Sequence, residues 1–358
     1  MMPCLRTATA LLAILLGLAG CASARPAAQS ALPATPLPIA SPAAASAPAV
    51  TAAPTVAPVP TIKPTPSPEP ELLYAFNPYA LPSDAKAYLG DKMKDYKLLV
   101  DALMQHKEKV LLGKGAASAA LSCIYAEFPL SVLLSDYTID QKGTTVSLRY
   151  VYDAAEHEVC IQAFQTRVEA VIRSTAKPSY NDCERALALY RWTAQNITYT
   201  DGNDVTPYHA LMDGHGICQS YAGVYRFLLL QMDMDSLSGS AFMTNDTAHE
   251  WNIVQLDNAW FHMDATFENG TTQGAGLQYF GMTDAQRLQS GALDPITTGI
   301  NDWCAPAPSC ENPCFEDLSA CTRWQIDSAN HRVLLYTEES LQPYGSFDTV
   351  AYRLVAEP

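Results

Sequence analysis

The chain has 358 residues, of which 22 are Lys or Arg and 37 are Asp or Glu, so its formal net charge is −15. This balance argues against a nucleic-acid-binding protein, because such proteins need basic patches that displace counterions from phosphates. Hydrophobic residues make up 48% of the chain, an ordinary value for a protein with a buried core. Proline is unevenly distributed, with 13 of the 25 prolines between Pro26 and Pro70.

Residues 1–20 resemble an export signal. Arg6 precedes an apolar run over 8–18 that is too short to cross a bilayer. The run is followed by Leu-Ala-Gly-Cys ending at Cys21, which resembles the lipobox of bacterial lipoproteins, where the cysteine carries the lipid. We expect Cys21 to anchor the protein to a bacterial cell membrane, on its extracytoplasmic side. The alternative is an ordinary secretory signal that happens to contain Cys21.

Residues 21–71 are predicted to be a linker without a core. Proline removes backbone donors and disfavours helix in the residue before it, and the Ala, Ser and Thr between the prolines offer little surface to bury. This composition is typical of an extended, disordered tether. We divide the remaining chain into an N-terminal region of helices and strands (72–178), a central domain (179–290) and a Cys-rich loop with C-terminal strands (291–358).

The folded part is predicted to combine helices with strands. Apolar spacing and β-branched alternation predict helices over 83–112, 156–173, 181–196 and 222–232, and strands over 144–152, 237–243, 249–256, 260–266, 332–336 and 349–354. Helices followed by an antiparallel sheet are typical of the α+β class.

Three side chains in the central domain have the chemistry of a cysteine catalytic triad. Cys218 follows a glycine-flanked loop and is expected in the first turn of its helix, where the helix dipole favours the thiolate. His249 begins a strand, and a tight turn at 257–258 leads into the strand that carries Asp264. In this hairpin Asp264 lies one diagonal step from the position opposite His249. A thiol, an imidazole and an orienting carboxylate are the parts that such a triad needs.

The motifs around these residues resemble the transglutaminase-like domain of the papain-like cysteine superfamily. The chain has G-I-C-Q-S-Y-A over 216–222, H-E-W-N over 249–252 and W-F-H-M-D-A-T-F over 260–267. These follow the family's order of G-x-C, H-x-W-N and W-x-x-x-D-[AP]-T motifs. The helix and N-I-T-Y segment over 189–199 also match bacterial members. The resemblance covers about 180–285, roughly a third of the chain.

The resemblance implies a core in which a nucleophile helix packs on an antiparallel sheet. It also implies roles: Cys218 as the nucleophile, His249 as the base and Asp264 as the residue that orients the base. An oxyanion hole needs a donor besides the Cys218 N–H. The position at which papain-type enzymes place a Gln is Met212 here, whereas transglutaminases use an upstream aromatic residue, for which Tyr199 is the candidate.

Two other histidines are alternatives to His249. His262 and Asp264 share a face of their strand, because side chains alternate with period two, so His262 would compete for the carboxylate or cap it from the other side. His215 precedes Cys218 by three residues and would form local hydrogen bonds. We keep His249 as the base, with His262 as a supporting or surface residue and His215 as a loop residue.

Four further cysteines lie close together in the chain, at Cys304, Cys310, Cys314 and Cys321. Their spacing lacks the C-x2-C pairs that are typical of zinc sites, so two disulfides are expected in an exported protein, with a zinc site as the alternative. The sequence has no P-loop, dinucleotide fingerprint or EF-hand. We therefore expect neither a cofactor nor a metal ion.

Together these features predict an envelope-anchored cysteine enzyme that forms a thioester with the carbonyl of a peptide bond or a glutamine carboxamide. Attack by water would make it a protease or amidase, and attack by an amine would make it a cross-linking transglutaminase; the triad does not distinguish them. Its expected partners are a protein or peptide substrate in the cell envelope and, through the lipid, a membrane. The alternative from another class is a non-catalytic binding or scaffold module that keeps the fold.

Overall fold

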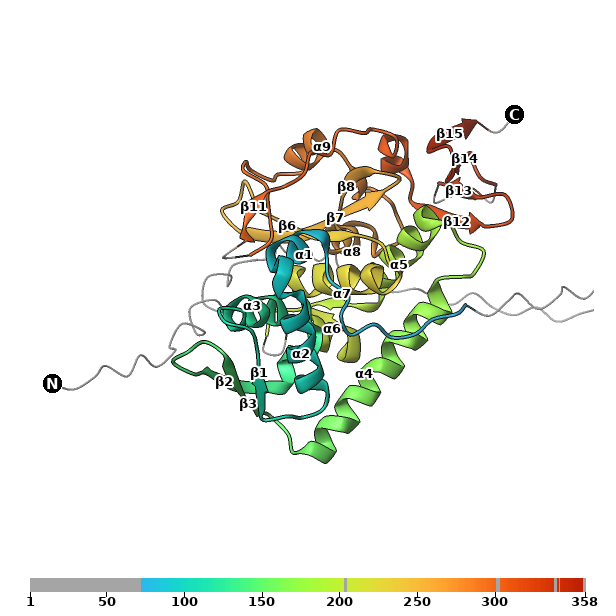
Figure 1. Cartoon of the computed structure of the whole chain (residues 1–358). Coiled ribbons are helices and arrows are strands. Elements are labelled where there is room, and N and C mark those ends of the chain that lie inside the picture. Colours follow the sequence, from blue (N-terminus) through green and yellow to red (C-terminus); the bar gives the residue numbers. More distant parts are fainter. Residues whose placement is uncertain (1–71, 203–204, 301–302, 338–339, 341, 357–358) are drawn as a thin grey trace, which may run out of the picture. The chain divides into compact units, whose positions relative to one another are not determined.

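The computed structural model describes residues 72–202, 205–300, 303–337, 340 and 342–356. The predicted signal peptide, the predicted tether and the lipidation candidate Cys21 lie outside these residues. The described chain combines helices with antiparallel sheets (Figure 1), so the predicted α+β class is confirmed.

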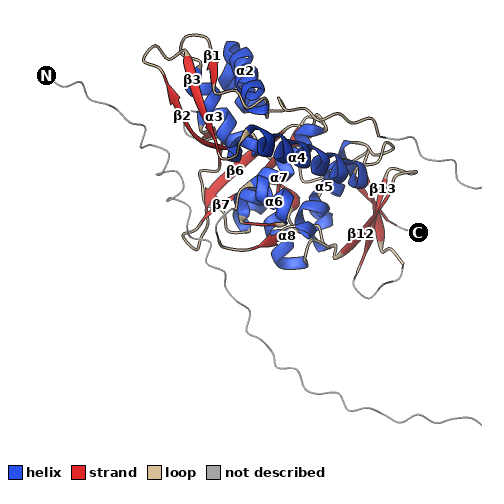
Figure 2. Ribbon diagram, turned by 90° about the horizontal axis from the view of Figure 1, so that it is seen from below, coloured by secondary structure: helices blue, strands red, loops and turns tan. Residues whose placement is uncertain are grey.

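The first part of the described chain packs helices beside a small sheet. Its elements are α1 (Ser83–Leu89), η1 (Gly90–Lys92), α2 (Met93–Met104), β1 (Lys109–Leu111), α3 (Ala117–Glu127), η2 (Pro129–Leu133), β2 (Leu134–Ile139), β3 (Thr145–Tyr150) and α4 (Ala154–Thr175). The strands are antiparallel in the order β1-β3-β2, and Figure 2 shows them beside α2 and α3.

The single helix predicted over 83–112 is wrong, because the chain breaks it twice. Gly90 has a φ of 50°, which favours glycine and ends α1. Helix α2 ends at Met104, and His106, with a φ of 53°, turns the chain toward β1. The apolar spacing continues across both breaks, so periodicity alone did not reveal them.

The central part carries the predicted nucleophile helix and the main sheet. Its elements are α5 (Asp182–Asn196), β4 (Thr198–Tyr199), α6 (Pro207–Asp213), β5 (His215–Gly216), α7 (Cys218–Gln231), β6 (Ser236–Phe242), β7 (Ala248–Leu256), β8 (Ala259–Met263), α8 (Ala265–Thr272), β9 (Phe280–Met282), α9 (Asp284–Gln289), β10 (Thr297–Thr298) and β11 (Ala305–Pro306). The sheet is antiparallel in the order β11-β10-β6-β7-β8-β9.

The hairpin of β7 and β8 has the predicted turn. Asp257 and Asn258 both have positive φ, 45° and 66°, as a two-residue turn that matches the strand twist requires. Leu256 consequently pairs with Ala259, and farther along the strands Asn252 pairs with Met263. This register places His249 and Asp264 at the same end of the hairpin.

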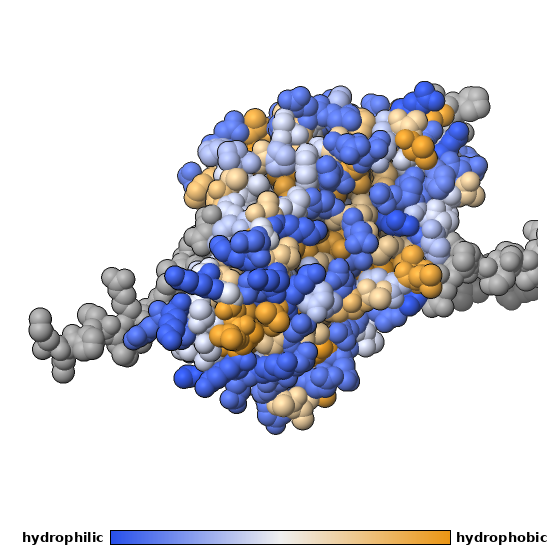
Figure 3. Space-filling model, viewed as in Figure 1, coloured by the Kyte–Doolittle hydropathy of each residue, from blue (hydrophilic) through white to orange (hydrophobic). Residues whose placement is uncertain are grey.

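Helix α7 packs against one face of this sheet. Asn252 Nδ2 donates to the Ala222 carbonyl at 2.9 Å, and Tyr225 Oη lies 3.3 Å from Met263 Sδ. The helix is buried along nearly its whole length, as is typical of a core helix. Figure 3 shows that the outer face in that view is mostly hydrophilic, with small separate apolar patches. None of the described helices is both long enough and apolar enough for a membrane span.

The last part of the described chain forms a four-stranded antiparallel meander. It follows η4 (Glu316–Ala320) and comprises β12 (Arg323–Asp327), β13 (Arg332–Tyr336), β14 (Gly345–Asp348) and β15 (Arg353–Ala356). The strand predicted over 349–354 is wrong, because this stretch contains the turn between β14 and β15. The Asp348 carboxylate accepts the N–H groups of Val350 and Ala351, which turns the chain before β15 begins.

The two disulfides expected among Cys304, Cys310, Cys314 and Cys321 are absent, and all four residues are thiols. Cys304 is exposed. Cys310 packs with Leu237 and Ile253, whereas Cys321 belongs to the main core. Cys314 packs against the same core, so these two cysteines share an environment from which Cys304 and Cys310 are separate.

Candidate active site

Cys218 is the first residue of α7, and its side chain is 7% exposed. The start of the helix is held by Ser220, whose Oγ accepts the Ile217 N–H at 3.1 Å and donates to the Val205 carbonyl. A Cβ at position 216 would collide with the Ser220 side chain. Gly216 therefore leaves the room that this cap needs, which gives the G-x-C spacing a physical reason.

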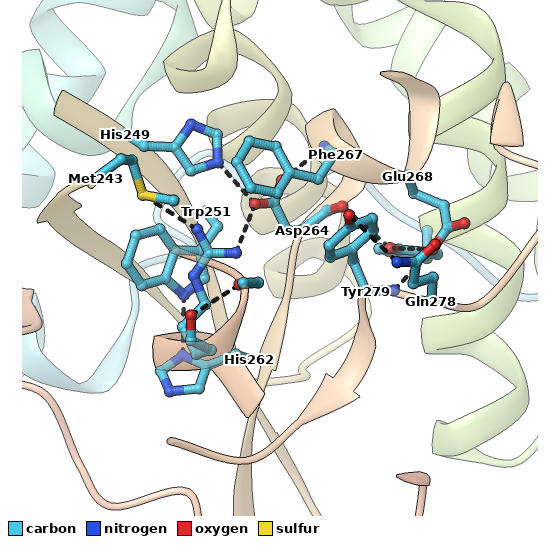
Figure 4. A network of polar contacts seen from close by, with 12 residues as sticks. Met243, His249, Trp251, His262, Asp264, Phe267, Glu268, Gln278 and Tyr279 are labelled. Carbon is cyan, nitrogen blue, oxygen red and sulfur yellow. Dashed lines mark hydrogen bonds and ion pairs between the residues drawn. The ribbon is translucent and has the colours of Figure 1, made fainter. Parts of the chain in front are cut away.

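His249 and Asp264 are in direct contact. His249 Nε2 lies 2.7 Å from Asp264 Oδ2, and both side chains are buried (Figure 4). Asp264 follows β8 directly and caps α8, because its Oδ1 accepts the Phe267 N–H at 3.0 Å. The Phe267 ring stacks on the His249 imidazole with 4.4 Å between ring centroids. The end of β8, the cap of α8 and the stacked Phe267 ring thus all help to orient the His249–Asp264 pair.

Asp264 has a second partner, a cation, that the sequence did not suggest. Arg287 Nη1 lies 2.9 Å from Asp264 Oδ2, and both side chains are completely buried. The guanidinium lies over the rings of Trp251, at 4.0 Å, and Phe267, at 5.1 Å. Arg287 is on α9, outside the three sequence motifs, and the sequence held no signal of this contact.

The surroundings of Asp264 keep it ionised. Burial by itself would raise the pKa of this carboxyl, but the His249 imidazole, the Arg287 guanidinium and the Phe267 N–H together lower the pKa below its ordinary value. An ionised carboxylate is only an acceptor. His249 therefore carries a hydrogen on Nε2 and donates it to Asp264, which leaves Nδ1 as the ring nitrogen that would act on a thiol.

His262 pairs with Asp284 instead of Asp264. His262 Nε2 lies 2.8 Å from Asp284 Oδ1, and its Nδ1 accepts the Trp251 Nε1–H at 2.9 Å. Burial outweighs the Asp284 contact and lowers the pKa of His262 to about 4, so the imidazole is neutral near pH 7. His262 thus supports Trp251 and α9, and the competition for Asp264 that the sequence allowed does not occur.

His262 also belongs to a group of three side chains that could hold a metal ion. Single donor atoms of His262, Asp284 and Cys310 lie within 4.8 Å of one another. A Trp N–H is only a donor, so it occupies the lone pair of His262 Nδ1 and requires the hydrogen on Nε2. Metal binding needs a lone pair on the ligating nitrogen. The set is therefore arranged for hydrogen bonds, because Nε2 donates to Asp284.

Tyr199, the candidate oxyanion donor, lies next to the nucleophile loop. Strand β4 pairs with β5 in parallel, with Tyr199 opposite Gly216 and Thr198 opposite His215. The Thr200 N–H donates to the Gly216 carbonyl at 3.1 Å. This short pair brings Tyr199 to the segment that leads into Cys218, and it holds His215 in a strand two residues before Ile217.

Known proteins share this part of the chain. Residues 167–265 match the family described as the transglutaminase-like superfamily, and this match includes Cys218, His249 and Asp264 but ends before Arg287. It begins earlier and ends earlier than the central domain expected over 179–290. No curated protein matches the chain.

Several solved structures are similar to parts of the chain. A candidate cysteine protease from Cytophaga hutchinsonii has 15% identity over 37% of this chain and 61% of its own, with a TM-score of 0.25. A TGase has 10% identity over 44% and 48%, with a TM-score of 0.27. Calcium-bound LapG from Legionella pneumophila has 14% identity over 43% and 82%, with a TM-score of 0.27. The chain spans less than two thirds of the first two proteins. The family match shows that the chain contains a transglutaminase-like domain.

Proposed function

We propose that the protein is a cysteine enzyme that transfers or hydrolyses acyl groups through a thioester at Cys218. The buried hydrogen bond between His249 Nε2 and Asp264 Oδ2 carries this proposal. A histidine held by an ionised carboxylate has a fixed tautomer and can stabilise the imidazolium that forms when it takes a proton from a thiol. The position of Cys218 at the start of α7 supports it further, because the helix dipole favours a thiolate there.

In the proposed reaction, His249 Nδ1 takes the Cys218 proton, and the thiolate attacks the carbonyl carbon of a peptide bond or a glutamine carboxamide. The resulting oxyanion accepts hydrogen bonds from the Cys218 N–H and from a second donor, for which Tyr199 remains our candidate. His249 then returns the proton to the leaving amine or ammonia, and a thioester forms. Water or an amine then attacks the thioester carbonyl carbon while His249 takes its proton. The bond between this carbon and Cys218 Sγ breaks, so an acid or a new amide is released and the Cys218 side chain is regenerated.

The test measures the alkylation rate of Cys218 by iodoacetamide as a function of pH. The exposed thiol of Cys304 serves as an internal reference in the same protein. We expect Cys218 to react rapidly at pH values well below about 8.5, the pKa of an ordinary thiol, and to react faster than Cys304 there. His249→Ala is expected to abolish the difference, and Asp264→Ala to reduce it. His331→Ala, a partly exposed histidine beside Glu184, is the matched control and should change nothing.

The second candidate is a non-catalytic binding or scaffold module, which the low exposure of Cys218 favours. This alternative predicts that Cys218 is inert toward iodoacetamide at every pH at which the protein stays folded. The same result would refute the enzyme proposal.

We also propose that a lipid on Cys21 anchors the protein to the outer side of a bacterial membrane, where a protein or peptide of the envelope is the substrate. The lipobox resemblance of the sequence before Cys21 supports this. The protein is expected to partition into detergent with membranes and to incorporate a fatty-acid analogue, and Cys21→Ser should abolish both. Unlabelled wild-type protein outside the membrane fraction would contradict the anchor and leave the catalytic proposal untouched.

A further inference from the structure

Arg287 is a buried cation outside the proposed triad. Its side chain has no exposed surface, and burying a guanidinium is costly unless it is paired. The carboxylate that it pairs with is Asp264, at 2.9 Å. Arg287 therefore lies in direct contact with the group that holds the predicted catalytic base.

The contacts of the Asp264 carboxylate are divided between its two oxygens. Oδ2 accepts from both Arg287 Nη1 and His249 Nε2, at 2.9 and 2.7 Å. Oδ1 accepts the Phe267 N–H at 3.0 Å. With three donors from three elements, α9, β7 and α8, the carboxylate plane cannot rotate without breaking a charge-assisted hydrogen bond.

The Arg287 guanidinium is itself held in place. It lies between the rings of Trp251 and Phe267, and its Nη2 lies 3.6 Å from Met243 Sδ (Figure 4). Helix α9 is fixed to β8 at a second point, because Asp284 binds His262. Asp284 and Arg287 are three residues apart on one helix face, and their partners His262 and Asp264 are two residues apart along one chain segment.

We propose that Arg287 is a positioning residue of the acyl-transfer reaction, which holds Asp264 ionised and oriented so that His249 keeps the tautomer that acts on Cys218. This inference rests on the proposed function and extends it to α9, beyond the family match. Lysine would not replace arginine fully, because a point charge lacks the planar group that fits between two rings.

Other titratable groups face Asp264 as well. Glu268 is on α8 and Tyr190 is on α5. Tyr190 Oη lies within hydrogen-bond distance of both the Glu268 carboxylate and the Asp264 backbone carbonyl. His262 is two residues away and neutral near pH 7. Neither Glu268 nor neutral His262 offers a positive charge to Asp264, so Arg287 is the fixed cation beside His249.

The test is a double-mutant cycle between Arg287 and Asp264, read by the pH profile of Cys218 alkylation in the full chain. Arg287→Met keeps an apolar side chain between the two rings and removes the charge. We expect the pH of half-maximal alkylation to rise by about one unit and the rate at pH 7 to fall about tenfold. In the Asp264→Asn background, the same change should have little further effect, because Arg287 acts through the carboxylate.

Arg191→Met is the matched control, since the Arg191 guanidinium also lies over a tryptophan, at 3.3 Å from the Trp324 ring centroid, without contact to the triad; it should leave the profile unchanged. If Arg287→Met fails to fold by circular dichroism, Arg287→Lys takes its place in the cycle, with a smaller shift expected.

Two outcomes would overturn the inference. One is an unchanged profile in folded Arg287→Met or Arg287→Lys. The other is an equal loss of rate in the native and Asp264→Asn backgrounds, which would show that Arg287 acts only through packing. A wild-type Cys218 that reacts like Cys304 would instead refute the proposed function itself, so the two failures are distinguishable.

Discussion

Two buried arginines on opposite faces of the main sheet have opposite charge surroundings. Arg287 lies over Trp251, whereas Arg226 contacts Glu250, the residue before Trp251 in β7. Neighbouring side chains of a strand point to opposite faces of the sheet. Arg226 Nε lies 2.9 Å from Glu127 Oε2 and its Nη1 lies 3.8 Å from Glu250 Oε1. One cation thus serves two carboxylates there, whereas at Asp264 one carboxylate receives donors from two basic side chains.

The consequence is a difference in the direction of the pKa shifts. Burial raises the pKa of Glu127 to about 7, and Arg226 offsets this only in part while Asp84 and Glu250 add to it. Burial also opposes ionisation of Asp264, yet His249 and Arg287 bring the pKa of Asp264 below its ordinary value. The number of counter-charges per carboxylate, and not burial alone, decides which buried acid is ionised.

The largest effect is expected when the cation is removed from the site with two carboxylates. Arg226→Met leaves Glu127 and Glu250 buried without a counter-charge and should lower the free energy of unfolding by about 3–5 kcal/mol. Arg287→Met should cost less, because His249 still donates to Asp264. Urea denaturation checks both, with Arg149→Met as a control for an exposed ion pair. Equal losses for Arg226→Met and Arg287→Met would contradict the comparison.

Glu127 should make stability depend on pH between about 4.5 and 7. Because its pKa is raised from 4.5 to about 7 in the folded state, the folded protein holds this proton more strongly than the unfolded chain. Stability from this group is therefore full below pH 4.5 and is lost as the pH rises to 7, by roughly 3 kcal/mol. Thermal unfolding of Glu127→Gln should show a flatter profile in this window. Glu169→Gln, at an exposed pair with Arg173, should match the wild type.

Asp264 should give a pH dependence of the opposite sign. Its pKa is lowered in the folded state, so its stabilising contribution is full above the unfolded value of about 3.9 and is lost as the pH falls below it. Asp264→Asn should remove this part of the acid-induced loss in unfolding measurements between pH 5 and 2. The pKa of Asp348 is also lowered, by the N–H groups of Ala351 and Val350. Asp348→Asn, at an exposed turn, should change the acid branch less; the reverse order would contradict the prediction.

The smallest effect is expected at Trp251. Trp251→Phe keeps an aromatic ring under Arg287 but removes the N–H that His262 Nδ1 accepts, and the loss of this hydrogen bond by itself should cost about 1 kcal/mol. The ¹⁵N shifts of His262 should report a hydrogen on Nε2 in the wild type and a mixture of tautomers in the variant. Trp324→Phe, which loses a bond to the Gly276 carbonyl, is the matched control with unchanged His262 shifts. A mixture of tautomers already in the wild type would refute the hydrogen-bond assignment.

The parts of the fold that were predictable from sequence are those set by neighbouring residues. The turn at 257–258 fixes the register of β7 and β8 within a few residues. Gly216 and Ser220 likewise fix the start of α7 locally. Where local patterns were ambiguous, as across Gly90 and after Asp348, the predicted elements were wrong.

The sequence by itself determined the α+β class, the transglutaminase-like motifs and the short-range arrangement of His249 and Asp264, because periodicity and turn residues act over a few positions. Only the tertiary structure decided which charged groups meet. Arg287 lies 23 residues beyond Asp264 and reaches it because α9 folds back across the sheet. Similarly, Arg226 on α7 and Glu127 on α3 are 99 residues apart in the sequence. Spacing in the sequence carries no information about such contacts, because they depend on how whole helices and strands pack. The contact with Arg287 helps to set the ionisation of Asp264 in the proposed site.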